Sequence, residues 1–149
     1  MINNINIKKD PAKARKSMGL CPQHNILYDE LTAYEHLVIY GTIKGAKEAE
    51  LNREINHLLK NLYMQSKRDE FTLSYSGGMK RKLNLAIALI AKSEIVVLDE
   101  VTSGIDSESR RAVWDVLTKE KRNRTILMST HFIEGRRCEW RFHRGDLLC

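Results

Sequence analysis

The sequence of 149 residues contains no hydrophobic run long enough to cross a membrane. Its longest apolar run, residues 85–91, falls far short of the roughly 18 to 20 residues that a membrane-spanning helix requires. The residues after Met1 also lack the apolar stretch of a secretory signal. We therefore expect the chain to work in the cytosol or at the cytosolic face of a membrane.

Cysteine, proline and glycine are also scarce. The three cysteines, Cys21, Cys138 and Cys149, are odd in number and form no C-x-x-C pair, so we expect reduced thiols rather than a disulfide framework or a cysteine metal site. With 2 prolines and 8 glycines, the composition is not that of a collagen-like or low-complexity chain. The length suits one domain with a hydrophobic core and is short for two.

Basic residues outnumber acidic ones by 25 to 19, which gives a formal charge of +6. Two basic clusters, residues 80–82 and 119–124, raise the alternative of a nucleic-acid partner. Both clusters fall on or beside expected helices, and neither is interleaved with aromatic residues for base stacking. We therefore interpret them as solvated helical faces and expect no nucleic acid to bind.

Several helices are expected from local patterns. Thr32 with Glu35 three residues later forms a capping box, which predicts that a helix begins there. A third, amphipathic helix follows a glycine-rich turn and ends near Lys92, and Ser107 is the expected N-cap of a fourth. Apolar residues at three- and four-residue spacing predict the second helix over residues 47–62; they are Leu51, Ile55, Leu58, Leu59 and Leu62.

Short β-branched runs predict the strands of a parallel sheet. Residues 95–98 have the pattern of a strand buried on both faces, and they end at Asp99 and Glu100. Residues 125–128 form a second such run, and residues 16–21 are a weaker candidate. A helix between the two clear strands implies a right-handed parallel crossover, and hence an α/β fold.

Three groups of residues at the ends of these elements are able to bind a ligand or take part in catalysis. Backbone N–H groups at Ser76-Gly77-Gly78, which opens a helix, suit an anion, although such a turn can equally be a flexible cap. Asp99 and Glu100 provide a hard oxygen ligand for Mg²⁺ and a second carboxylate that orients water; the alternative is a solvated strand end. His131 could contact a terminal phosphate in the same crevice, or be structural.

The order of these motifs makes a specific pattern. LSYSGGMKRKL at residues 73–83, VVLDE at 96–100, TSGID at 102–106 and STH at 129–131 resemble the signature, Walker B, D-loop and switch regions of ABC transporter ATP-binding cassettes. GLCPQHN at residues 19–25 resembles the Q-loop, and together with the signature it is similar to the A subfamily, whose members mostly move lipids. The resemblance extends from about Ile7 to Ile133.

The resemblance implies ATP and Mg²⁺ as ligands and assigns a role to several positions. Gln23 would touch Mg²⁺ and couple the site to the membrane domain, and Asp99 would hold the metal. Glu100 would polarise the attacking water, and His131 would contact the γ-phosphate. Transmembrane domains of a parent transporter are the implied partners, which places the chain at the cytosolic face of a membrane.

A second cassette is the other implied partner. In a head-to-tail pair, Ser76, Gly77 and Gly78 would cap the γ-phosphate bound by the opposite cassette, and Asp106 would lie along the interface. The implied fold is a partial P-loop NTPase core of parallel strands plus a helical signature subdomain. Residues 1–24 and 93–134 would form the core, residues 25–92 the helical subdomain, and residues 135–149 an atypical C-terminal segment.

The chain departs from the family in one decisive respect. It contains no G-x-x-x-x-G-K-[ST] pattern and not one Gly-Lys dipeptide, so the loop that holds the phosphates is missing. We therefore expect the 149 residues alone to be deficient in ATP hydrolysis. The family's phosphate-loop strand sits beside the strand at residues 125–128, so we also expect an unpaired apolar edge there.

Two smaller departures and three alternatives remain open. Val101 replaces the usual proline, which we expect to be tolerated, and residues 135–144 differ from the family, which a shifted reading frame would explain.

The chain could be a non-catalytic module that docks onto an intact cassette, or a truncated gene model. A fragment of a soluble ABC-type ATPase is disfavoured by the exporter pattern around Gln23.

Overall fold

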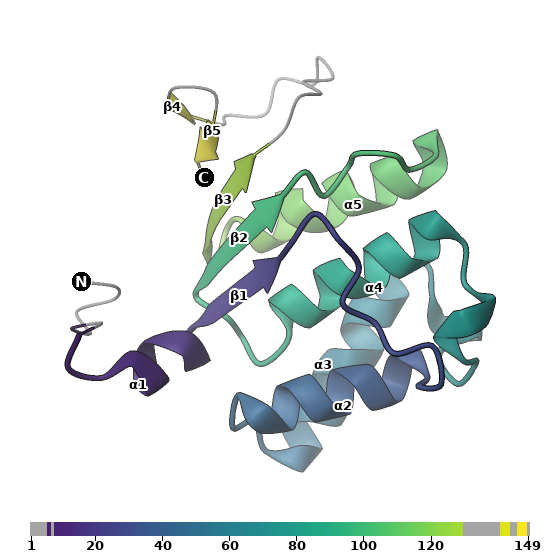
Figure 1. The fold of residues 1–149 in the computed structure, drawn as a ribbon, viewed down its shortest axis with the longest axis horizontal. Helices are drawn as coiled ribbons and strands as arrows, with labels where there is room; N and C mark the ends of the chain where they lie inside the picture. The colour runs from purple at the N-terminus through teal and green to yellow at the C-terminus, as the bar shows by residue number, and fades with distance from the viewer. Residues whose placement is uncertain (1–5, 7, 130–140, 144–145, 149) are drawn as a thin grey trace.

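The computed structural model describes residue 6 and residues 8–129, 141–143 and 146–148 (Figure 1). Its helices are α1 (Pro11–Lys16), α2 (Ala33–Ile43), α3 (Glu48–Asn61), α4 (Gly77–Leu89) and α5 (Ser107–Glu120), with short 3-10 turns η1 (Gln65–Lys67) and η2 (Thr72–Ser74). Its strands are β1 (Met18–Cys21), β2 (Ile95–Asp99), β3 (Thr125–Ser129), β4 (Arg141–His143) and β5 (Asp146–Leu148). No helix among these residues is long and apolar enough to span a membrane.

The strands form one sheet in the order β1-β2-β3-β5-β4. The first three are parallel, so their carboxyl ends lie at one edge of the sheet; Met18 pairs with Ile95, and Ile95 pairs with Thr125. This confirms the predicted parallel α/β core. The weak strand candidate at residues 16–21 is confirmed as β1.

The outer edge of β3 is covered by β5. Leu127 pairs with Leu148 and Ser129 with Asp146 in antiparallel register, and β4 then pairs with β5. The prediction of an unpaired edge beside residues 125–128 is therefore wrong for this structure. The exposed N–H and C=O groups of an apolar edge need partners, and a strand from later in the same chain provides them.

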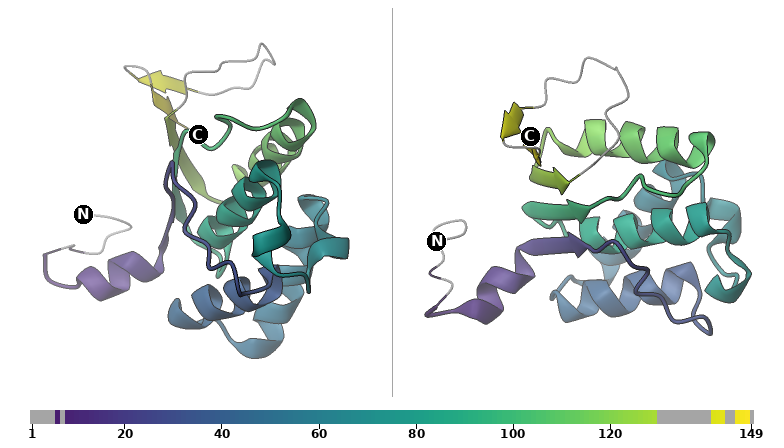
Figure 2. Two further views of the ribbon diagram at one scale, coloured as in Figure 1. Left: turned by 45° about the vertical axis from the view of Figure 1, so that its right-hand side comes forward. Right: turned by 45° about the horizontal axis from the view of Figure 1, so that its top comes forward.

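Helices cover one face of the sheet in the described residues. Figures 1 and 2 show α4 and α5 against that face, and Cys21, Val96 and Ile126 point into the resulting core. On the opposite face Leu20 is 60% exposed and Val97 is only partly buried. The expectation that residues 95–98 are buried on both faces is therefore wrong, because alternate residues of a strand face opposite sides and only one side is packed.

The helices α2, α3 and α4 pack together beside the sheet. The capping box of α2 is present as predicted, since Thr32 accepts from the Glu35 amide and Glu35 accepts from the Thr32 amide. The predicted apolar face of α3 is buried. In contrast, α4 is not amphipathic, because every residue from 81 to 90 is buried. Its polar residues Arg81, Lys82 and Asn84 are therefore buried against neighbouring elements rather than exposed to solvent.

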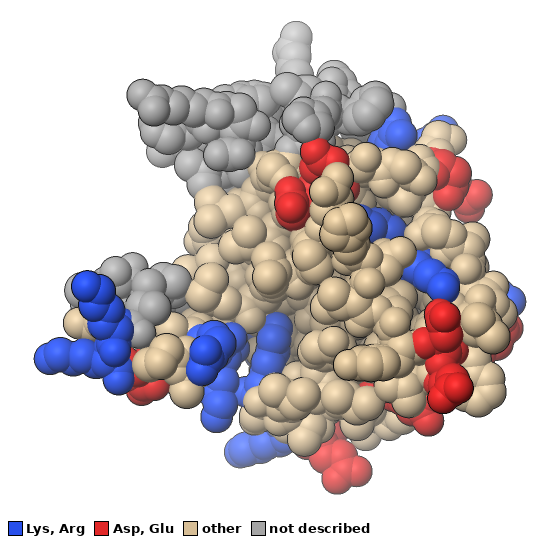
Figure 3. All heavy atoms as spheres, in the orientation of Figure 1, with Lys and Arg blue, Asp and Glu red and all other residues tan. Residues whose placement is uncertain are grey.

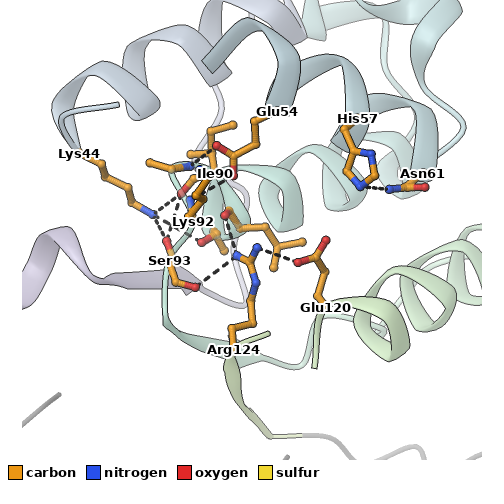
Figure 4. Close-up of polar contacts among 12 residues, drawn as sticks. Lys44, Glu54, His57, Asn61, Ile90, Lys92, Ser93, Glu120 and Arg124 are labelled. Atoms are coloured by element: carbon orange, nitrogen blue, oxygen red, sulfur yellow. Dashed lines mark hydrogen bonds and ion pairs between the residues drawn. The ribbon is translucent and has the colours of Figure 1, made fainter. Parts of the chain in front are cut away.

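Helix α4 ends at Leu89, earlier than the expected Lys92, and its end is tied to neighbouring elements (Figure 4). Ala91 and Lys92 have left-handed φ angles of 60° and 51°, and their N–H groups donate to the Glu54 carboxylate.

Lys44 donates to the Ala88 and Ile90 carbonyls and to Ser93 Oγ. Arg124 donates to the Leu89 and Ser93 carbonyls and pairs with Glu120. The C-terminal end of the helix is thus held by side chains from the end of α2, from α3 and from the residue before β3.

Positive charge gathers at the surface of α1. Figure 3 shows Lys and Arg side chains over this helix, and Lys13, Arg15 and Lys16 are exposed in its last turn. Much of the central surface in the same view carries no charge. The basic residues of α1 therefore contribute to the net positive charge together with the clusters at residues 80–82 and 119–124.

Candidate nucleotide-binding site

The carboxyl ends of β1 and β2 bring Gln23 and Glu100 together. Cys21 pairs with Leu98, so the residues that follow each strand leave the sheet side by side. Gln23 Nε2 donates to Glu100 Oε2 over 3.1 Å, between residues 77 positions apart. Polar side chains at the carboxyl edge of a parallel sheet line the usual ligand crevice of α/β proteins.

Asp99 and Glu100 are oriented by β3. Ser129 Oγ donates to Asp99 Oδ1 over 2.5 Å, and the Glu100 amide donates to the Ser129 carbonyl over 3.1 Å. Glu100 has a left-handed φ of 46°, which a non-glycine residue adopts only when its surroundings hold it there. Asp99 is exposed and Glu100 half-buried. Both carboxylates can therefore meet a ligand from solvent.

The donor set suits a magnesium ion that is shared with a phosphate. Mg²⁺ prefers hard oxygen ligands, keeps several waters and takes only one or two protein carboxylates when substrate phosphates complete its shell. Asp99 offers a carboxylate, and because Gln23 Nε2 donates to Glu100, the amide oxygen is the atom of Gln23 that can bind a cation. Within the described part of the chain, no three His, Cys, Asp or Glu side chains are grouped so that they could hold a metal ion.

Ser76, Gly77 and Gly78 form a turn, called here the signature turn, at the start of α4. Ser76 is the N-cap and accepts from the Met79 amide over 3.3 Å. No acidic residue lies in the first turn, so the N–H groups and helix dipole favour an anion there. Ser76 and Gly77 are exposed, and a Cβ on Gly77 would meet nothing within 4 Å.

Asp106 lies on the inner side of the signature turn. It caps α5, accepting from the Ser109 amide over 2.8 Å, so the predicted cap Ser107 is wrong by one residue. The hydrogen bonds from Ser109 lower the pKa of Asp106. A Cβ on Gly78 would lie 2.6 Å from Ser109 Oγ and 2.7 Å from Asp106 Oδ2, so any larger residue would force these side chains to shift.

Arg81 is a buried residue that the sequence interpretation missed. Only 4% of its surface is exposed, and its guanidinium donates to four backbone carbonyls: Pro22 (2.6 Å), Gln23 (2.9 Å), Asp99 (2.6 Å) and Val101 (3.1 Å). These carbonyls come from the two segments that carry Gln23 and Glu100. Arg81 therefore joins α4 to both sides of the candidate site.

The prediction that residues 80–82 form a solvated face is wrong. Lys80 pairs with Asp29 over 3.0 Å, and Arg81 points to the sheet. Lys82 is buried; burial lowers its pKa, while the charges of Asp106 and Glu108 oppose that shift. Each basic side chain extends to a different element, because the helix is enclosed on all sides.

Asn84 is a second residue that the sequence interpretation missed. Asn84 Nδ2 donates to Asn25 Oδ1 over 2.6 Å, and Asn84 Oδ1 accepts from the Ile26 amide over 3.3 Å. The signal in the sequence is the spacing of three residues between Arg81 and Asn84, which puts two polar side chains on one face of an otherwise apolar helix.

The switch residue His131 lies outside the described residues, so its predicted place near the carboxylates stays a prediction. The remaining predicted residues fall into two groups. Gln23, Asp99 and Glu100 meet at the carboxyl edge of the sheet, and Ser76, Gly77, Gly78 and Asp106 meet at the start of α4 and α5.

Comparison with known proteins agrees with this geometry. A protein-family model described as ABC transporter matches residues 1–103. The chain belongs to the ABC transporter family. Its relatives are members of the A subfamily: mouse phospholipid-transporting ATPase ABCA3 is 48% identical over 133 residues, which are 89% of this chain and 8% of that protein. Human ATP-binding cassette sub-family A member 2 is 44% identical over 128 residues, 86% of this chain and 5% of that protein.

A solved structure shares the fold of this ABC chain. The structure, described as the ATP-binding subunit of an ABC transporter, superposes with a TM-score of 0.76 at 28% identity, over 88% of this chain and 55% of that chain. The predicted family, A subfamily and α/β nucleotide-binding fold are thereby confirmed. The chain spans 8% of the length of mouse ABCA3 and 5% of that of human sub-family A member 2.

Proposed function

We propose that this chain forms part of an ATP-binding cassette that hydrolyses ATP to move lipids across a membrane, at its cytosolic face. The observation that carries the proposal is the meeting of Gln23, Asp99 and Glu100 at one sheet edge. The similarity to a phospholipid-transporting ATPase supports lipids as the transported class. Residues 1–24 and 93–134 would supply the core, and residues 25–92 the helical subdomain.

The carboxylate edge would serve the nucleotide bound on this side. Asp99 and the Gln23 amide oxygen would hold Mg²⁺, which when bound neutralises phosphate charge. Glu100 would orient and polarise the attacking water from its half-buried position beside Gln23. His131 would contact the γ-phosphate. Phosphoryl transfer depends mainly on such positioning and charge stabilisation, and Gln23 would also transmit the state of the site to transmembrane domains.

The signature turn would serve the nucleotide of a second cassette. Ser76 and Gly77 are exposed and present N–H groups at the positive end of α4, which suits a γ-phosphate brought by a partner arranged head to tail. Asp106, which lies behind Gly78, would line the same interface. The partner would thus complete a site to which this chain contributes one side.

The 149 residues on their own are expected to lack ATP hydrolysis, because they include no phosphate loop. An alternative function is that of a non-catalytic module that docks onto an intact cassette. The exposed signature turn favours this alternative for the isolated chain, since docking requires the turn but not the chain's own nucleotide.

Co-purification with a complete A-subfamily cassette tests the docking that both the proposed function and its alternative require. The chain should bind in the presence of Mg-ATP, and Ser76→Arg should abolish binding because the added side chain fills the phosphate position. Ser66→Arg, at an exposed serine of η1, is the matched control and should leave binding intact. Binding that needs no ATP, or that tolerates Ser76→Arg, would contradict the proposal.

Hydrolysis by the isolated chain is the second measurement. Magnesium-dependent release of phosphate should not exceed the background of the buffer. If the chain did hydrolyse ATP, and Glu100→Gln abolished that activity, the expected deficiency would be wrong and the chain would be an enzyme without a phosphate loop.

A further inference from the structure

The contacts of Arg81 lie on both sides of the Gln23–Glu100 pair. Its Nη1 donates to the carbonyl of Gln23, which is one member of the pair, and to that of Pro22, the residue before it. Its Nη2 and Nε donate to the carbonyls of Asp99 and Val101, the residues immediately before and after the other member. One side chain therefore connects two segments that lie more than 70 residues apart in the sequence.

The chemistry of the guanidinium makes this arrangement specific. A planar guanidinium carries five N–H donors in a rigid fork and stays charged at any relevant pH, whereas a lysine ammonium is a flexible point charge. All four acceptors of Arg81 are main-chain carbonyls. Those of Pro22 and Gln23 lie beyond the last β1–β2 pair, Cys21 with Leu98, where strand pairing no longer sets the separation of the two segments. Arg81 thus determines the separation and orientation of the two segments, and no other side chain reproduces its geometry.

Asn84 strengthens the connection one turn further along α4. It binds the Asn25 side chain and the Ile26 amide, so residues 22–26 contact α4 at two successive turns. The C-terminal end of α4 is anchored by Glu54, Lys44 and Arg124 (Figure 4). Residues 22–26 are therefore linked by Arg81 and Asn84 to α4, whose first residues form the signature turn.

We propose that Arg81 is a positioning residue that holds Gln23 and Glu100 in contact and links their geometry to the signature turn on the same helix. Its importance for ATP hydrolysis rests on the function proposed above, but the positioning itself needs no nucleotide. A displacement of the signature turn by a partner would be passed through Arg81 to the residue that polarises water.

The test uses NMR of the whole chain without nucleotide. The side-chain amide resonance of Gln23 reports its contact with Glu100, and Glu100→Ala gives the reference position for a broken contact. In Arg81→Lys the Gln23 resonance should move most of the way to that reference. Asn84→Ala should move it in the same direction and by less, and this variant keeps the test available if Arg81→Lys does not fold.

Arg124→Lys is the matched control. Arg124 also donates to two main-chain carbonyls, but at the opposite end of α4 and away from Gln23. Both arginine variants should lower the urea midpoint, while only Arg81→Lys should move the Gln23 resonance. If Arg81→Lys lowers stability and leaves the resonance unmoved, Arg81 is a structural residue and the inference is wrong. Failure of ATP-dependent docking alone would refute the proposed function and leave the positioning intact.

Discussion

A methyl group on Gly78 would lie 2.7 Å from Oδ2 of Asp106, so the signature turn and the cap of α5 are in direct contact. Asp106 cannot retreat easily, because it accepts a hydrogen bond from the Ser109 amide. The two elements that we propose to face a second cassette are therefore packed against each other within this chain.

Gly78→Ala should destabilise the chain by about 1 to 3 kcal/mol, the usual cost of overpacking a tight contact. Gly77→Ala is the matched control: nothing lies within 4 Å of its Cβ position and its φ is not left-handed, so it should be neutral or stabilising by up to about 1 kcal/mol. Urea unfolding followed by circular dichroism measures both. Equal effects would show that the close approach to Asp106 does not determine stability.

Val96→Thr and Val97→Thr should separate the two faces of the sheet. Val96 is fully buried against the helices, so a hydroxyl there should cost about 1 to 3 kcal/mol. Val97 is only partly buried on the opposite face, and threonine suits an exposed strand, so its replacement should cost less than about 1 kcal/mol. Thermal unfolding of both variants is the measurement. A larger loss of stability in Val97→Thr would show that the face of Val97, not that of Val96, is the packed one.

Lys44 should make stability depend on pH. Burial lowers its pKa from 10.5 to about 8 in the folded chain, with Glu54 opposing the shift. Between these two values the unfolded chain binds more protons, so the contribution of Lys44 to the unfolding free energy rises as the pH is raised from about 8 to 10.5.

Comparison with Lys44→Met isolates this effect. Cys21 titrates in an overlapping range with the opposite sign and is retained in the variant, so it cancels in the difference. The unfolding free energy of the native chain minus that of Lys44→Met should rise with pH across the window. A flat difference would mean that Lys44 keeps its ordinary pKa.

Cys21 should resist alkylation in the folded chain. Burial raises its pKa from 9.0 to about 11, and the thiol has no exposed surface. At pH 8 the thiolate fraction should be about 100-fold lower than that of an ordinary cysteine, and restricted access should slow alkylation further. Iodoacetamide labelling, followed by mass spectrometry of the peptide that contains Cys21, should be slow in buffer and fast in urea. Fast labelling in buffer would show that β1 opens readily.

The predictions from sequence succeed where the determining interactions are local. The apolar spacing of α3 and the capping box of Thr32 and Glu35 involve residues within one or two helical turns, and the structure confirms both. The motif order identified the family for the same reason, because each motif is a short segment with its own turn or strand end.

The predictions fail where distant segments decide the outcome. Arg81 is an ordinary charged residue in sequence, and its burial follows only when the ends of β1 and β2 place four carbonyls around it. The pairing of β5 with β3 likewise joins residues as far apart in the sequence as Leu127 and Leu148, and no local pattern selects that partner.

The sequence by itself therefore determined the family, the presence of helices α2 to α5 and the residue types at the site, because periodicity, capping and strand-end motifs are local properties. Only the tertiary structure decided that Gln23 meets Glu100, that Gly78 contacts Asp106, and that Arg81 lies between the two segments of the site. Hydrogen bonds and close packing require atoms within a few ångströms, and that proximity is set by the register of the sheet and the position of α4 against it.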